Sequence, residues 1–147
     1  MTIEQEITRQ QDMETPVPIL ITDRDWLRLR QMMAELPDRR QPAIDFLHRE
    51  LARAVVYPSR SIPPNVVTMN SRVTFRIGDG KVPDSGVLVY PEDYVADHRQ
   101  ISVTSLVGAA LLGLRSGAGI LHHSLDGHQM QVFVEEVSYQ PQAAARG

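Results

Sequence analysis

The pattern of apolar residues changes at a proline-rich segment in the middle of the chain, residues 58–64. Before this segment, large apolar residues recur at intervals of three and four positions, which is typical of one face of an α-helix. After it, short β-branched runs are separated by turn residues such as Gly78-Asp79-Gly80. Because the helical and strand patterns are segregated along the chain, the sequence predicts an α+β fold whose two units are joined by an extended linker.

The first unit, residues 19–57, is predicted to be a short antiparallel helical hairpin. Each predicted helix carries a stripe of apolar residues: Trp26, Leu29, Met33 and Leu36 in the first, and Ile44, Leu47, Leu51 and Ala54 in the second. Thr22 is a suitable N-cap for the first helix, Asp25 completes a capping box, and the helix is expected to end before Pro37. The heptad-like spacing suits two helices that pack along each other as a short arm, about 20 Å long, with Trp26 in an inter-helix or core contact.

The second unit, residues 65–141, is predicted to contain about five antiparallel strands and one short helix. The helix is expected within residues 107–114, and Asp126-Gly127 is favourable turn chemistry between the last two strands. Residues 1–18 are predicted to be a flexible leader, because they carry few large apolar side chains to offset the entropy of ordering. Residues 142–147 are predicted to be a frayed tail.

The composition argues against several functions. The 147 residues include no cysteine, which excludes disulfides, thiolate metal sites and a cysteine nucleophile. The formal net charge is −3, whereas proteins that grip duplex phosphates usually carry a basic surplus, so autonomous nucleic-acid binding is not expected. No apolar run reaches the roughly 18 residues of a membrane-spanning helix. We expect a cytoplasmic monomer with no membrane partner.

The sequence contains no convincing catalytic or metal-binding constellation. His122, His123 and His128 cluster near the last predicted hairpin, but adjacent positions of a strand point to opposite faces, so we interpret them as solvated hairpin residues. Gly117-Ala118-Gly119 lacks the third glycine of a phosphate-binding loop and is interpreted as a turn. We therefore predict no catalytic residue, no metal and no cofactor, and we favour a protein-binding module over an enzyme.

Five segments of the second unit, in order, resemble one protein family. They are residues 66–73 (VVTMNSRV), 88–91 (LVYP), 101–103 (ISV), 108–115 (GAALLGLR) and 137–141 (VSYQP). These segments and their separations are similar to those of the Rnk family, regulators of nucleoside diphosphate kinase that are related to the Gre transcript-cleavage factors. Residues 19–57 agree with that family in type, as a short helical hairpin, more than in identity.

The resemblance implies a C-terminal domain like that of FK506-binding proteins (FKBP-like) behind a coiled-coil finger. Members of the wider family dock this domain at the rim of the secondary channel of bacterial RNA polymerase and place the finger in the channel. Gre factors carry acidic residues at the tip of a longer finger, where they hold a catalytic magnesium ion, whereas Rnk-type proteins do not stimulate cleavage and compete with the Gre factors. The resemblance therefore implies a non-catalytic transcription regulator that acts by occupying space in the channel.

Two groups of candidate site residues follow from the resemblance. The candidates for polymerase docking are Ser102, Thr104, Ser105, Leu106 and Arg72, and the residues at the hairpin tip are Glu35, Asp38, Arg39 and Arg40. Gre factors have Asp-Ser-Pro where this chain has Thr104-Ser105-Leu106, and they have Gly-Asp where it has Gly117-Ala118. The cleavage motif is absent from the tip, and the two arginines there oppose the binding of magnesium.

The sequence leaves two other functions open. The chain could stimulate transcript cleavage with Glu35 and Asp38, or it could be a prolyl isomerase, which would need an aromatic pocket around Phe75 or Tyr90. The family's named link to nucleoside diphosphate kinase is interpreted as an indirect expression effect, because no residue of this chain indicates binding of a kinase.

Overall fold

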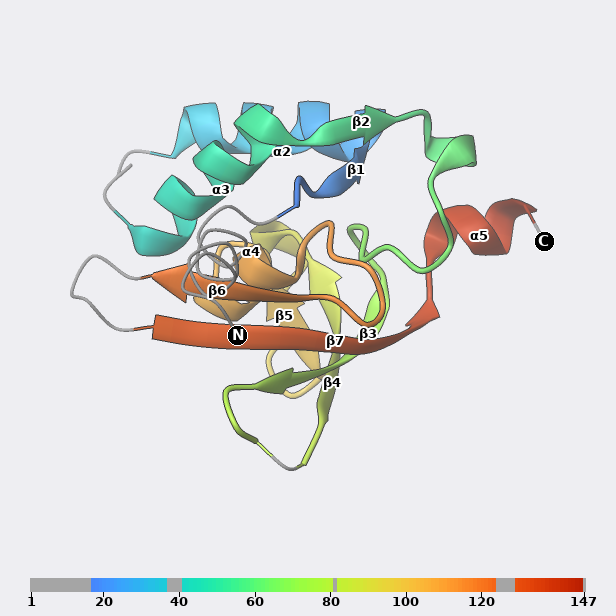
Figure 1. Ribbon diagram of the computed structural model, residues 1–147. Helices are drawn as coiled ribbons and strands as arrows, with labels where there is room; N and C mark the ends of the chain where they lie inside the picture. Colours follow the sequence, from blue (N-terminus) through green and yellow to red (C-terminus); the bar gives the residue numbers. More distant parts are fainter. Residues whose placement is uncertain (1–16, 37–40, 81, 124–128, 147) are drawn as a thin grey trace, which may run out of the picture.

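The computed structural model in Figure 1 describes residues 17–36, 41–80, 82–123 and 129–146. The elements are β1 (Leu20–Thr22), α2 (Asp23–Glu35), α3 (Pro42–Arg53), β2 (Val55–Tyr57), η1 (Ser59–Ser61), β3 (Arg72–Ile77), β4 (Asp84–Val89), η2 (Pro91–Asp93), β5 (Gln100–Ser102), α4 (Leu106–Leu111), β6 (Gly119–His123), β7 (Gln129–Tyr139) and α5 (Pro141–Arg146), with η denoting a 3₁₀-helix.

The two predicted helices are present, and their starting signals behave as expected. The backbone N–H of Asp25 donates to Thr22 Oγ1 at 3.1 Å, which caps α2, and Leu36 lies just beyond its last turn. Pro42 occupies the first turn of α3, where a backbone N–H would have no acceptor within the helix, so its absence costs no hydrogen bond. The indole Nε1 of Trp26 donates to the carbonyl of Leu51 at 3.2 Å, so the predicted contact between the helices is confirmed.

The helices do not form the predicted coiled-coil finger. They connect two short strands, β1 and β2, that were not predicted from the sequence. Strand β1 pairs with β2 in parallel, with Leu20 opposite Val55. Parallel neighbours need a crossover connection, and α2 and α3 together supply it. The first unit is therefore a β-α-α-β crossover.

The main sheet has five strands in the order β5-β4-β3-β7-β6. The expectation that all its strands are antiparallel was wrong, because β5 runs parallel to β4, with Leu88 opposite Ile101 and Val89 opposite Ser102. The connection through η2 is long enough to return the chain to the same end of the sheet. The other three pairings are antiparallel, so the sheet is mixed.

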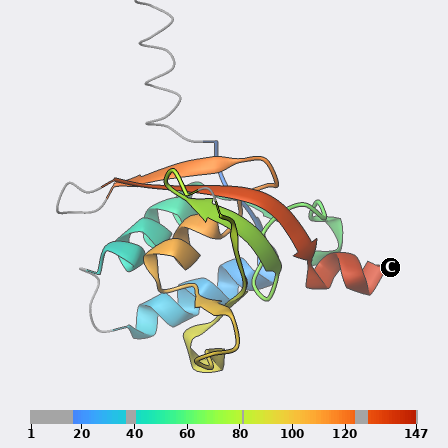
Figure 2. The same ribbon diagram turned by 90° about the horizontal axis from the view of Figure 1, so that it is seen from below.

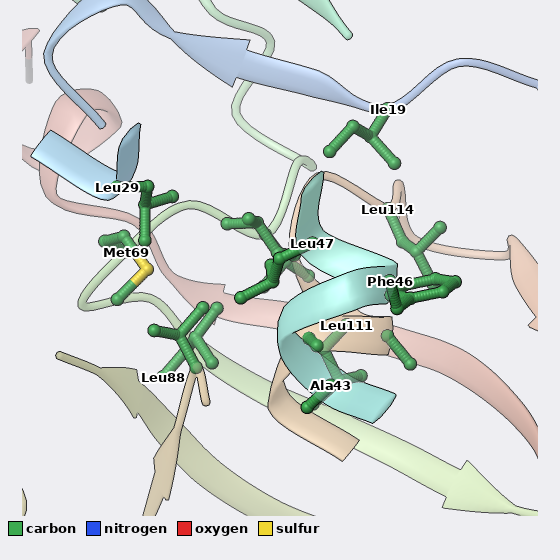
Figure 3. Close-up of a cluster of buried hydrophobic side chains, with 14 of the residues drawn as sticks. Ile19, Leu29, Ala43, Phe46, Leu47, Met69, Leu88, Leu111 and Leu114 are labelled. Carbon is green, nitrogen blue, oxygen red and sulfur yellow. The ribbon is translucent and has the colours of Figure 1, made fainter. Parts of the chain in front are cut away.

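Helices α2, α3 and α4 lie on the same side of the sheet, as Figure 2 shows. Side chains from both units form one hydrophobic core, in which Ala43, Phe46 and Leu47 of α3 lie beside Leu111 and Leu114 (Figure 3). The same apolar stripes that would suit a coiled-coil seam are thus used to cover the sheet and α4.

The end of the helical crossover nearest the predicted finger tip is buried. Met33 at the end of α2 is 1% exposed, and Ala43 and Ile44 at the start of α3 are 4% and 1% exposed. All three side chains belong to the core that also contains Leu111 and Val134 of the second unit, whereas the end of a projecting finger would contact only its own two helices. The expectation of a protruding plug is therefore wrong for this structure.

Gly113, just after α4, lets the two units approach closely. Its φ is +79°, and a Cβ there would lie 2.5 Å from Ile19 Cβ, so a larger residue would push β1 away. Its carbonyl accepts from Leu20 N–H at 3.2 Å, and its N–H donates to Val67 O at 2.8 Å. This glycine therefore joins β1 to the second unit.

The C-terminal residues form helix α5 instead of the expected frayed tail. Arg146 donates from Nη1 to Arg60 O at 2.7 Å and from Nη2 to Ile62 O at 3.0 Å. The buried Gln140 donates from Nε2 to Pro63 O at 2.8 Å and Val66 O at 2.9 Å. These bonds fasten the proline-rich segment 58–64 to the end of the chain.

Candidate protein-docking site

Four of the five predicted docking residues lie together where β5 ends and α4 begins. Ser105 is the N-cap of α4, because its Oγ accepts from Gly108 N–H at 3.0 Å. The same Oγ donates to Ser102 O at 2.6 Å, and the hydroxyls of Ser102 and Thr104 lie 2.8 Å apart. We call the segment Ser102–Leu106 the docking loop.

The docking loop packs tightly on the first turn of α4. A Cβ at Gly108 would lie 2.0 Å from Ser102 O, so only glycine allows the loop to approach the helix this closely. The three loop hydroxyls are hydrogen-bonded within the loop, whereas Leu106 is 38% exposed. The loop therefore presents an apolar side chain on a rigid support.

Arg72, the fifth predicted docking residue, is not in the docking loop. It lies on β3 opposite Val87, which in turn is opposite Gln100 of β5. Arg72 therefore lies two strand spacings, or roughly 10 Å, from β5. It is in register with Gln100, the first residue of β5, whereas Ser102 is the last residue of that strand. The predicted docking set is therefore divided between the loop and the sheet.

The residues of the predicted tip are only partly described. Glu35 ends α2 and is exposed, whereas Asp38, Arg39 and Arg40 lie outside the described residues. Because the adjoining helix ends are buried, Glu35 is held beside the globular core and not at the end of a finger.

The structure describes part of the predicted histidine cluster. His122 and His123 are consecutive residues of β6, and His128 lies outside the described residues. In the part of the chain that the structure describes, no three His, Cys, Asp or Glu residues are arranged to hold a metal ion.

Phe75 and Tyr90, which a prolyl isomerase would need in an open pocket, are core residues. Phe75 on β3 and Tyr90 after β4 are both buried in the shared hydrophobic core. The hydroxyl of Tyr90 is occupied by a hydrogen bond to Asp25, at 3.3 Å from Oδ1.

A buried polar junction that the sequence analysis missed holds α2 against the second unit. Asp25 is 9% exposed, and its Oδ2 accepts from the backbone N–H of Met69 at 3.1 Å. Burial raises the pKa of this carboxyl, although the hydrogen bonds from Met69, Thr22 and Tyr90 oppose the rise. Burial and the nearby Asp25 carboxylate also raise the pKa of the Tyr90 hydroxyl, so it remains a hydrogen-bond donor at neutral pH.

Arg28 covers the junction from the solvent side. Its guanidinium carbon lies 3.7 Å from the centre of the Tyr90 ring, and its Nη2 lies 2.8 Å from Glu92 Oε1 and 3.8 Å from Asp93 Oδ2. The hydrogen bond from Arg28 lowers the pKa of Glu92. The capping box was the only sequence signal for the junction. It identified Asp25 as a local cap but gave no sign of its partners Met69 and Tyr90, which are 44 and 65 residues away.

In the described ranges, no helix has the length and apolar character required to cross a membrane.

Comparisons with known proteins agree on one family. Residues 18–56 match the family described as Rnk N-terminus, and residues 62–139 match the family described as transcription elongation factor, GreA/GreB, C-term. The chain is 41% identical over 127 residues to the regulator of nucleoside diphosphate kinase of Escherichia coli K12, covering 86% of this chain and 93% of that protein. The regulator of nucleoside diphosphate kinase of Shigella flexneri matches to the same extent.

A solved structure supports the same assignment. The transcription elongation factor GreA/GreB from Nitrosomonas europaea is 39% identical, with a TM-score of 0.67 over 84% of this chain and 100% of that one. The chain therefore belongs to the Rnk family of regulators of nucleoside diphosphate kinase, with a C-terminal part of the GreA/GreB type.

Proposed function

We propose that this protein is a non-catalytic transcription regulator that binds bacterial RNA polymerase near its secondary channel and competes there with Gre factors. Family membership supports a role in transcription, since the second unit matches the GreA/GreB C-terminal family. The observation that carries the proposal is the docking loop, in which Leu106 is exposed on a support of internal hydrogen bonds.

The geometry of the helices favours competition at the rim of the channel over action inside it. A factor that delivers a catalytic magnesium ion must carry carboxylates away from its globular part. Here the end of α2 is packed against the core, with Met33 buried beside the exposed Glu35. Excluding Gre factors requires only that the same rim surface be covered.

The docking loop of this chain binds without a charge of its own. Thr104 stands where the resemblance to Gre factors implies an aspartate, so an ion pair with a polymerase arginine is replaced by hydroxyl and apolar contacts. Apolar burial is insensitive to salt, whereas an exposed ion pair is screened. We therefore expect binding that changes little between low and physiological ionic strength.

The test is retention of the full-length chain by purified bacterial RNA polymerase, with and without an excess of a Gre factor. Retention that the Gre factor abolishes is expected, together with no release of short RNA from backtracked complexes. An absence of binding, or binding that a Gre factor does not affect, would refute the proposal.

Two leucine variants locate the binding surface. Leu106→Glu places a charge in the proposed interface and is expected to weaken binding at least about tenfold, equivalent to about 1.4 kcal/mol. Leu27→Glu is the matched control, because Leu27 is 54% exposed on α2, outside the docking loop. Equal binding by the two variants would show that the docking loop is not the contact surface.

A further inference from the structure

An apolar groove of about 540 Å³ lies beside strand β6, and nothing described so far occupies it. Its floor is made of buried side chains that include Ile19, Leu114 and Ile120. Phe133, which is 40% exposed, and Leu121 contribute to its apolar wall. The groove could therefore cover several apolar side chains of an incoming segment.

One wall of the groove is the edge of the main sheet. Strand β6 ends the strand order and pairs with β7 on one side only, with Gly119 opposite Phe133 and Leu121 opposite Gln131. An unpaired edge beside apolar surface invites pairing with another segment, which proteins usually prevent by covering the edge. Among the described residues, no strand covers the second edge of β6.

The groove contains one charged residue, and the adjoining part of the chain has the opposite charge. Arg115 is the charged residue in the lining, and it is exposed. Val17 and Pro18 belong to the lining, so the preceding residues 1–16 continue directly from the groove. That segment holds four acidic residues and one arginine, giving a formal charge of −3.

The segment also has apolar side chains that suit the groove. Ile3, Ile7 and Met13 are spaced among its polar residues. A segment tethered this closely has an effective concentration in the millimolar range, so weak contacts are enough to hold it. We propose that residues 1–16 dock in this groove in the same molecule, covering the edge of β6, with their acidic side chains near Arg115.

Engineered cysteine pairs test this proposal, because the chain has no cysteine of its own. Ile7→Cys combined with Leu121→Cys places one thiol in the segment and one in the groove. The control pair combines Ile7→Cys with Leu27→Cys, since Leu27 is exposed. Leu27 lies within about 25 Å of Val17 along β1 and α2, a distance that the chain between Ile7 and Val17 can span.

We expect the groove pair to form an intramolecular disulfide at least about tenfold faster than the control pair under mild oxidation. Adding Arg115→Glu is expected to slow the groove pair by about two- to fivefold, the range for an exposed ion pair, and to leave the control pair unchanged. Equal rates for the two pairs would overturn the proposal. Disulfides between two molecules would also overturn it, because they would identify a second copy as the occupant.

Hydrogen exchange of the otherwise unaltered chain gives a second test. Ile3→Asp together with Ile7→Asp should remove the apolar contacts of the segment while leaving every residue of the groove unsubstituted. Faster exchange of the β6 amides Gly119–Leu121 is expected, with unchanged exchange in β4. Unchanged exchange in β6 would contradict the proposal, even if the cysteine pairs had reacted.

Discussion

Replacing Asp25 by alanine should destabilise the protein far more than replacing its exposed neighbour Asp23. Asp25→Ala removes the acceptor for the buried Met69 N–H and for the Tyr90 hydroxyl. A hydrogen bond to a charged group contributes about 1.5–3 kcal/mol, and a buried donor left without a partner costs about 1–3 kcal/mol. Relief of the desolvated carboxylate offsets part of this loss. We expect a net loss of about 2–4 kcal/mol.

Urea unfolding measures this loss directly, and thermal unfolding provides a check. For a domain near this size, each kcal/mol shifts Tm by roughly 2–4 °C, so Asp25→Ala should lower Tm by roughly 5–15 °C. Asp23→Ala is the matched control, because Asp23 is also in the first turn of α2 but, among the residues that the structure describes, accepts only exposed bonds from Arg24 N–H and the Ser59 hydroxyl. Its loss should stay below about 1 kcal/mol.

A double-mutant cycle separates the hydrogen bond from general disruption. Tyr90→Phe deletes the hydroxyl alone, and its combination with Asp25→Ala should show a coupling energy of about 0.5–1.5 kcal/mol. If Asp25→Ala cost no more than Asp23→Ala, or if the coupling were zero, the reasoning that the junction holds α2 against the second unit would be refuted.

Three further predictions concern the titration of Asp25, the close approach at Gly113 and the hydrogen bonds of Arg146. Burial raises the pKa of Asp25 in the folded state, so the folded state binds the proton more tightly than the unfolded chain. The free energy of unfolding of the wild type relative to Asp25→Asn should therefore fall as pH rises through the raised pKa. A difference in unfolding free energy that did not change with pH would contradict this. Gly113→Ala should cost at least about 2 kcal/mol in urea unfolding, because its Cβ would clash with Ile19, whereas Gly117→Ala, with φ of +85° but open space, should cost only about 1 kcal/mol. Arg146→Ala should speed amide exchange in α5 while lowering global stability by less than about 1 kcal/mol, and unchanged exchange would show that its two bonds do not hold the helix.

Features set by neighbouring residues could be predicted from the sequence. The cap of α2 and the proline at the start of α3 depend on side chains within three residues of the backbone they serve. Family resemblance was also recognisable, because the motifs of the second unit occur in order. Ser102–Leu106 could be identified as one segment because its residues are consecutive in the chain.

Features set by distant residues could not be predicted. The apolar stripe of Leu29 and Met33 fits a coiled-coil seam and a sheet-covering helix equally well, and only the partner surface decides between them. Strands β1, β2 and β5 have three residues each, too few to show alternation or direction. The position of Arg72 relative to the docking loop depended on sheet register, which no local pattern specifies.

The most direct test of the claim that the helical crossover and the sheet share one core is an unfolding experiment with a probe in each part. Trp26 is the only tryptophan of the chain, so its fluorescence reports on α2, and the amide signals of Val73 and Phe75 report on β3. We predict one cooperative transition in urea, with the same midpoint for both probes. Loss of the Trp26 signal at a clearly lower urea concentration, while the sheet remains folded, would contradict the claim.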